Sequence, residues 1–181
     1  MGGSFNRSLW RSVGETISIE GRALSNEGRW GQGIAWAPDI NLFRDPRWGR
    51  GQEVPGEDPV LNSEYAFEYI TGLQGLDEED YIRVVATPKH FSAYDLERWN
   101  GTDRHDFDAV VTYGELVEYF WPAFQSAFQR GKAQSTMCSY NAVYVRNQTQ
   151  AVKGVPSCAN GFFNNGIIRG EWGFDGFIVS E

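Results

Sequence analysis

Hydrophobic residues along this chain of 181 residues follow two different periods. Apolar side chains recur at roughly helical spacing over residues 7–24, which predicts an amphipathic helix. A short apolar run at 34–37 is typical of a strand. By the same criteria, we predict further helices over about 59–73, 114–130 and 161–171, and further strands over about 82–86, 133–138 and 176–180.

The connections and two prolines add detail to this pattern. Pro59 fits the first turn of the second helix, where its missing N–H costs nothing. Pro122 lies inside the third predicted helix and is expected to kink it. The remaining segments are polar, and we predict an acidic turn at 77–80, a loop from His90 to about residue 113, and a surface loop at 144–154.

Helices and strands therefore alternate along the chain, and alternation of this kind predicts a parallel sheet with crossover helices. Polar residues follow each predicted strand, at the edge where (β/α)8 barrels build their active sites. A complete barrel has eight strands and about 250 residues. We therefore predict an α/β fold that is part of a TIM-type barrel, truncated at both ends. A flavodoxin-like open sheet is the alternative, although the chain has no glycine loop suited to phosphate.

Composition excludes some partners. Sixteen basic and 24 acidic residues give a net charge of −8, which disfavours binding to nucleic acid or to an anionic membrane surface. No apolar run approaches the roughly 20 residues of a membrane-spanning helix, and the N-terminus has no signal-peptide core. His90 and His105 do not match any familiar zinc spacing with Cys138 and Cys158, so we expect no cofactor.

Two features bear on the cellular compartment. Glycosylation sequons begin at Asn6, Asn100 and Asn147, and they weakly favour a secreted, extracellular glycoprotein. In that compartment Cys138 and Cys158 would form a disulfide, whereas two buried thiols are an equally good interpretation of the sequence.

The segment from Trp36 to Pro59 is the most distinctive stretch. It follows a predicted strand and is dense in glycine, proline and charges of both signs, which indicates a shaped loop. Such a loop suits a polar, ring-shaped ligand, and a salt-bridged structural loop is the alternative. Trp36, Trp48 and Trp99 have the chemistry to stack on sugar faces, but core packing is favoured for each.

Five motifs extend this interpretation to the whole chain. They are, in order, N-L-F-R-D-P-R-W-G-R-G-Q-E-V-P-G-E-D-P, K-H-F-S-A-Y-D-L-E, M-C-S-Y-N-A-V, G-V-P-S-C-A-N and W-G-F-D-G-F-I-V-S-E. Together they resemble the N-terminal barrel domain of glycoside hydrolase family 3, in its β-xylosidase-like branch. The resemblance implies a retaining β-glycosidase that removes terminal non-reducing xylose or glucose from oligosaccharides, as in xylan or β-glucan breakdown.

The resemblance also implies site residues. The catalytic nucleophile of the family corresponds to Glu181, the residue after W-G-F-D-G-F-I-V-S. Because the ends of parallel strands meet at one edge, we expect a single pocket shared by Glu181 and the sugar-binding positions. Those positions are Arg50, Lys89, His90, Met137 and Tyr140.

Each sugar-binding assignment has a structural alternative. Arg50 would otherwise form an ion pair within its own loop, and Tyr140 would otherwise bond to backbone. Lys89 and His90, at a strand end before an aromatic residue, are the better candidates for hydrogen bonds to sugar hydroxyls. Met137 is as well explained by plain packing.

The chain departs from the family pattern in three ways. Glu181 replaces an aspartate, which lengthens the side chain by one methylene. The segment 144–154 carries an insertion relative to the family pattern N-A-V-N-G-V-P. The run K-H-F-S-A-Y-D lacks the histidine of K-H-F-P-G-H-G, so the acid/base carboxylate should come from a second domain outside residues 1–181. A catalytically inactive sugar-binding relative is the alternative function.

Overall fold

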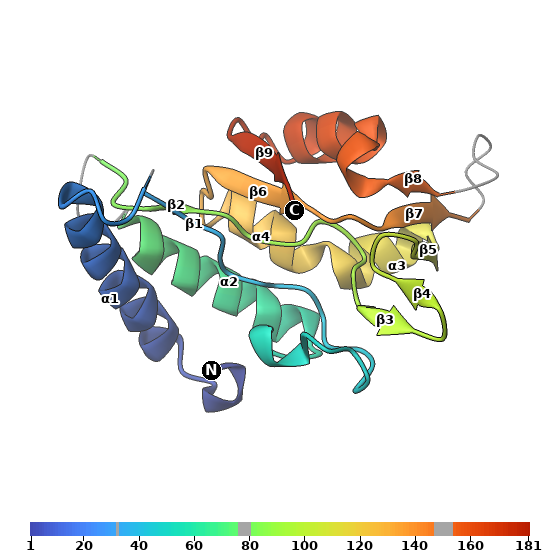
Figure 1. The fold of residues 1–181 in the computed structure, drawn as a ribbon, viewed down its shortest axis with the longest axis horizontal. Coiled ribbons are helices and arrows are strands. Elements are labelled where there is room, and N and C mark those ends of the chain that lie inside the picture. The colour runs from blue at the N-terminus through green and yellow to red at the C-terminus, as the bar shows by residue number, and fades with distance from the viewer. Residues whose placement is uncertain (32, 76–80, 147–153) are drawn as a thin grey trace.

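Four short parallel strands carry the fold in the computed structural model (Figure 1). The structure describes residues 1–31, 33–75, 81–146 and 154–181, so the predicted acidic turn and most of the 144–154 segment lie outside the described residues. The strands are β1 (Ile34–Ala35), β2 (Val85–Ala86), β6 (Ser135–Cys138) and β9 (Phe177–Ser180). β1 pairs with β2 and β6 with β9, both in parallel. A parallel bridge from Phe91 to Cys138 joins the two pairs, so the spatial order follows the chain.

Helices lie along these strands (Figure 1). The first two are α1 (Arg7–Asn26) and α2 (Pro59–Gln74), whose first turns are capped by the side chains of Asn6 and Asp58. α1 packs directly on α2. The backbones approach closely because a Cβ at Gly14 would lie 2.5 Å from the Tyr69 carbonyl oxygen. The predicted alternation of helices and parallel strands is therefore confirmed for these elements.

The third predicted helix is interrupted just before Pro122, as expected for a proline inside a helix. It consists of α3 (Tyr113–Glu115), a π-helical turn η3 (Leu116–Phe120) and α4 (Pro122–Gln129). Pro122 opens the new helix, where its lack of an N–H is tolerated. A second π-helical segment, η5 (Phe162–Glu171), precedes β9. Three short 3-10 turns complete the helical elements, namely η1 (Gly2–Ser4), η2 (Gly51–Glu53) and η4 (Ser157–Ala159).

An aromatic core fills the space between strands and helices. Phe91 is completely buried and its ring lies within 5.0–6.1 Å of four others, those of Trp121, Phe124, Phe163 and Trp172. Because Phe91 directly follows His90, this packing also fixes the backbone beside the predicted site. None of the helices in the described residues is long and apolar enough to cross a lipid bilayer.

Two segments predicted as loops contain strands instead. β3 (Arg98–Trp99) and β4 (Thr102–Asp103) form an antiparallel hairpin. Its turn is Asn100-Gly101, with φ of 47° and 84°, the left-handed conformation that such a dipeptide favours. β5 (Asp108–Val111), β7 (Ala142–Val145) and β8 (Val155–Pro156) form a three-stranded sheet. The prediction of loops was wrong here for two reasons. Arg98 and Trp99 are both exposed, so β3 shows no buried face, and β5 alternates exposed and buried positions over only four residues, too short a run to stand out from the polar residues before it.

Candidate active site

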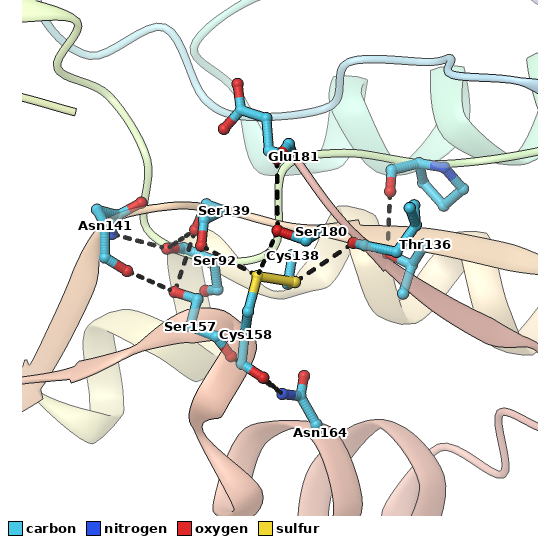
Figure 2. Close-up of a disulfide and its surroundings, with 12 residues drawn as sticks. Ser92, Thr136, Cys138, Ser139, Asn141, Ser157, Cys158, Asn164, Ser180 and Glu181 are labelled. Atoms are coloured by element: carbon cyan, nitrogen blue, oxygen red, sulfur yellow. Dashed lines mark hydrogen bonds between the residues drawn. A yellow bond between two sulfur atoms is a disulfide. The ribbon is translucent and has the colours of Figure 1, made fainter. Parts of the chain in front are cut away.

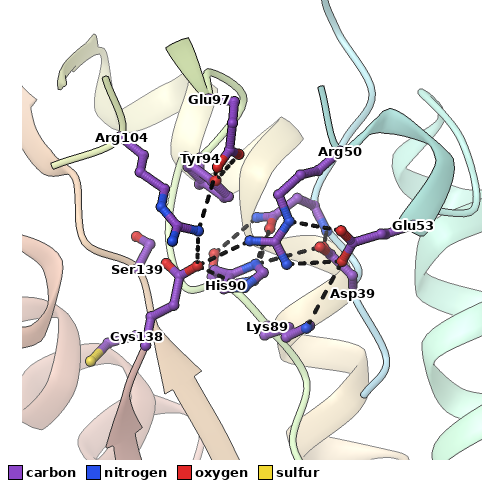
Figure 3. A network of polar contacts seen from close by, with 12 residues as sticks. Asp39, Arg50, Glu53, Lys89, His90, Tyr94, Glu97, Arg104, Cys138 and Ser139 are labelled. Atoms are coloured by element: carbon purple, nitrogen blue, oxygen red, sulfur yellow. Dashed lines mark hydrogen bonds and ion pairs between the residues drawn. The ribbon is translucent and has the colours of Figure 1, made fainter. Parts of the chain in front are cut away.

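All of the predicted site residues except Met137 lie beyond the carboxyl ends of the four parallel strands. Glu181 follows β9 directly, and Lys89 and His90 follow β2 after Thr87 and Pro88. Tyr140 follows β6, and Arg50 lies in the long loop after β1. Figure 3 shows that segments far apart in the sequence meet here in one network of polar contacts.

The Glu181 carboxylate is the centre of this network. Its Oε1 lies 2.7 Å from Arg104 Nη1, 3.0 Å from Arg50 Nη1 and 3.5 Å from His90 Nε2. The side chain of Glu181 is only 10% exposed, so the carboxylate and the two guanidinium groups interact in a partly desolvated environment. Oε2 is buried and has no hydrogen-bond partner among the described residues. The structure therefore brings Arg50, His90 and Glu181 together, as the sequence predicted.

Arg50 also forms an ion pair within its own loop, which was the structural alternative to sugar binding for this residue. Its Nε and Nη2 donate to the two carboxylate oxygens of Glu53 at 2.8 and 2.9 Å, a bidentate arrangement. The hydrogen bond from Arg50 is the main reason that the pKa of Glu53 lies below its ordinary value, and the same pair raises the pKa of Arg50. Lys89 Nζ lies 3.9 Å from Glu53 and joins the network on the same side. Glu53 thus links two of the predicted sugar-binding residues.

Tyr140 and Met137 lie differently from the other predicted residues. The ring of Tyr140 lies 4.6 Å from that of His105 and 5.1 Å from the Arg104 guanidinium. Tyr140 is therefore linked to Glu181 through Arg104. Met137 is 2% exposed within β6, where it pairs with Val179, so packing between strands accounts for its position.

Arg104 is the main site residue that the sequence analysis missed. It follows the β3–β4 hairpin, and besides Glu181 it contacts Glu97 at 3.4 Å. The Tyr94 hydroxyl donates a hydrogen bond to Glu97, and burial raises the pKa of Tyr94. The Asn100-Gly101 dipeptide was the available signal, because a hairpin there returns the chain toward the strand ends.

The tryptophans divide into two groups. Trp48 is 5% exposed and packs edge-on against Tyr94 at 5.4 Å, so core packing is correct for this residue. Trp36 and Trp99 are 60% and 54% exposed, so for them that expectation was wrong. Arg47 lies 4.6 Å over the Trp99 ring and connects the long loop to the hairpin.

A disulfide joins Cys138 to Cys158 beside the site (Figure 2). Their Cα atoms are 5.1 Å apart, and Cys138 pairs in the β6–β9 ladder with Ser180, the residue before Glu181. Ser157 extends the connection, because its hydroxyl donates to the Asn141 carbonyl at 3.0 Å. Of the two states left open by the sequence, the structure has the disulfide. The described residues contain no group of three His, Cys, Asp or Glu side chains able to hold a metal ion.

Comparison with known proteins identifies the family. The model of the glycosyl hydrolase family 3 N terminal domain matches residues 2–181. Beta-xylosidase/alpha-L-arabinofuranosidase 1 of Medicago sativa subsp. varia is 47% identical over 180 residues, which are 98% of this chain and 22% of that protein. A probable exo-1,4-beta-xylosidase of Aspergillus clavatus is also 47% identical, over 181 residues with the same coverage.

Solved structures agree with this result. The chain superposes on a GH3 exo-beta-xylosidase in complex with a xylobiose aziridine activity-based probe with a TM-score of 0.91 and 42% identity, covering 99% of this chain and 22% of that one. Beta-glucosidase 3B from Thermotoga neapolitana in complex with glucose gives 0.81 and 30%, with the same coverage. The chain thus spans about a fifth of the length of these relatives. It belongs to glycosyl hydrolase family 3, within the N-terminal domain of that family.

Proposed function

We propose that the protein carrying this chain hydrolyses terminal non-reducing β-linked xylose or glucose residues of oligosaccharides by a retaining mechanism. The observation that supports this most directly is the Glu181 carboxylate, on which the guanidinium groups of Arg50 and Arg104 converge from separate segments, with His90 Nε2 3.5 Å from the same oxygen. The relatives named as xylosidases and glucosidases support the same reaction class.

In this mechanism Glu181 is the nucleophile. Oε1 accepts hydrogen bonds from Arg50 and Arg104, which hold the carboxylate in place. Attack by the carboxylate forms a bond to the anomeric carbon while the glycosidic C–O bond breaks. Water then displaces the carboxylate from that carbon and releases the sugar. Lys89 can donate hydrogen bonds to sugar hydroxyls, and His90 Nε2 is at the same edge of the strands.

The remainder of the catalytic machinery is proposed to lie outside residues 1–181. We assign these residues to a (β/α)8 barrel of which β1, β2, β6 and β9 are four adjacent strands, truncated at both ends. The acid/base carboxylate, which protonates the leaving oxygen and then takes a proton from the attacking water, belongs to a second domain. Acid catalysis contributes about 10²–10⁴-fold, so the 181-residue chain alone should show little or no turnover.

A mechanism-based label tests the nucleophile. The full-length protein is incubated with an aziridine probe of the β-xylose configuration and digested, and the labelled peptide is sequenced by mass spectrometry. Label on Glu181, and none on Glu181→Gln, is the expected result. Label on a different carboxylate would contradict the assignment of the nucleophile.

A sugar-binding protein without activity is the second candidate, and the presence of glutamate at position 181 is what favours it. In that case the probe leaves no label, aryl β-xylosides and β-glucosides are not hydrolysed, and Glu181→Asp does not restore turnover. Xylose or glucose would still protect the protein against thermal unfolding, because a ligand that binds the folded state stabilises it.

We also propose that the protein is secreted. The Cys138–Cys158 disulfide and the sequon at Asn100, exposed at the hairpin tip, support this. Expression in a eukaryotic secretory host should give a protein with a glycan on Asn100, detected as a loss of mass after enzymatic deglycosylation. The Asn100→Gln variant is the control. Retention of the full-length protein inside the cell would contradict the proposal.

A further inference from the structure

His90 is held from beneath by the segment that follows β1. Lys89 N donates to the Pro38 carbonyl at 3.0 Å, and Ile40 N donates to the Lys89 carbonyl at 2.9 Å, so the two strand ends remain paired up to His90. The side chains of Asp39 and Asn41 are buried here, at 5% and 3% residue exposure, and His90 is 1% exposed. These side chains are therefore shielded from bulk solvent.

Asn41 fixes the backbone of His90. Its Nδ2 donates to the His90 carbonyl at 2.9 Å, while its Oδ1 accepts the His90 N–H at 2.8 Å. This pair of bonds determines the orientation of the amide, because exchanging oxygen and nitrogen would break both. The oxygen of Asn41 is therefore also the atom 3.2 Å from His90 Nδ1.

Asp39 presents a second oxygen to the same nitrogen. Its Oδ1 accepts the Asn41 N–H at 3.1 Å, and its Oδ2 lies 3.4 Å from His90 Nδ1 without any other partner among the described residues. Two oxygens thus face Nδ1. A proton on Nδ1 can be donated to the Asn41 oxygen at 3.2 Å and also faces the carboxylate of Asp39, whereas a lone pair on Nδ1 would face two oxygens. The opposite nitrogen, Nε2, points toward Glu181 (Figure 3).

We propose that Asp39 and Asn41 are positioning residues that hold His90 with its proton on Nδ1, so that Nε2 is the atom presented to Glu181 and to the sugar. The proton on Nδ1 depends only on hydrogen bonds within the chain. The presentation of Nε2 to a sugar rests on the proposed glycosidase function. Neither residue touches the substrate, and both act through the imidazole.

The Asp39→Asn variant tests the proposal with a nearly isosteric change. The Asn41 N–H still requires the oxygen at the Oδ1 position, so the new NH₂ group must take the place of Oδ2 and face Nδ1. A donor facing Nδ1 favours the tautomer with its proton on Nε2. The matched control is Asp103→Asn, because Asp103 Oδ1 also lies 3.1 Å from a histidine Nδ1, that of the exposed His105.

The tautomer is measured directly by long-range ¹H–¹⁵N correlation spectra of the ¹⁵N-histidine-labelled full-length protein. The signals of His90 are identified as those that disappear in the His90→Gln variant. We expect the Nδ1–H pattern for His90 in alkaline solution and the Nε2–H pattern after Asp39→Asn, with no change after Asp103→Asn. An Nε2–H pattern in the unmodified His90 would overturn the proposal without any variant at Asp39.

Kinetics on the full-length enzyme provide the second readout. Asp39→Asn should lower kcat/KM by about 10–100-fold, the usual effect of removing a partner that orients a functional histidine. Asp103→Asn should leave it unchanged. An equal kcat/KM per folded molecule in Asp39→Asn would also overturn the proposal. An enzyme that is inactive even without substitutions would contradict the proposed function, while the histidine spectra would still decide the hydrogen bonding.

Discussion

Shortening the proposed nucleophile is the most informative change that this site offers. Glu181→Asp withdraws the carboxylate by one C–C bond, about 1.5 Å. If nothing else moves, the 2.7 Å contact with Arg104 and the 3.0 Å contact with Arg50 both lengthen beyond the roughly 3.5 Å limit of a hydrogen bond. The two guanidinium groups are then free to bind sugar hydroxyls, and space opens in front of the carboxylate.

The expected effect is a gain in activity. In the structure Glu181 occupies donors of Arg50 and Arg104. Under the proposed function a bound sugar uses these donors, and the extra methylene carries the attacking oxygen forward of the position that aspartate would give it. A misplacement of about 1 Å at a reacting atom costs about 100-fold. We therefore expect Glu181→Asp to raise kcat/KM by about 100-fold, which corresponds to about 2.7 kcal/mol of transition-state stabilisation.

The assay is steady-state hydrolysis of aryl β-xylosides and β-glucosides by the full-length enzyme, normalised to the folded fraction. Glu181→Gln is the control, since it keeps the length of the side chain but removes the nucleophile, and it should reduce turnover to background. Activity of Glu181→Asp at or below that of the unmodified enzyme would refute the reasoning. It would mean that Arg50 and Arg104 are placed to suit the length of a glutamate side chain at position 181.

Three further predictions concern stability. The hydrogen bond from Arg50 lowers the folded-state pKa of Glu53 below 4.5, so its stabilisation is present above that pH and is lost as the pH falls through the lowered value. The Tm should therefore fall as the pH is lowered into the acid range, and it should fall less in the Glu53→Gln variant, which lacks this titrating group. Replacing Cys138 and Cys158 by serine should lower the free energy of unfolding in denaturant by about 3 kcal/mol, because the bond closes a loop with a sequence separation of 20; an unchanged value would contradict this. Phe91→Ala should cost about 3–5 kcal/mol in the same assay, because it empties the centre of the aromatic core; a cost below that of an ordinary surface substitution would contradict it.

The sequence by itself determined the elements of the parallel layer and their order. Hydrophobic period distinguishes helix from strand because burial on one face repeats with the local geometry, and this holds for α1, α2 and the four parallel strands. Strand ends followed by polar residues were enough to place Lys89, His90 and Glu181 at one edge. The family motifs added Arg50.

The tertiary structure alone decided which of these side chains touch, and through which atoms. Arg104 is 77 residues from Glu181 in sequence and Arg50 is 131 residues away, yet both bind the same carboxylate oxygen. Asp39 and Asn41 meet His90 only because two parallel strands pair beneath it. The local pattern of polarity records whether a side chain is buried, but not its partner. Partners are selected when distant segments pack, since a buried polar group must then find its hydrogen bonds among whatever lies beside it.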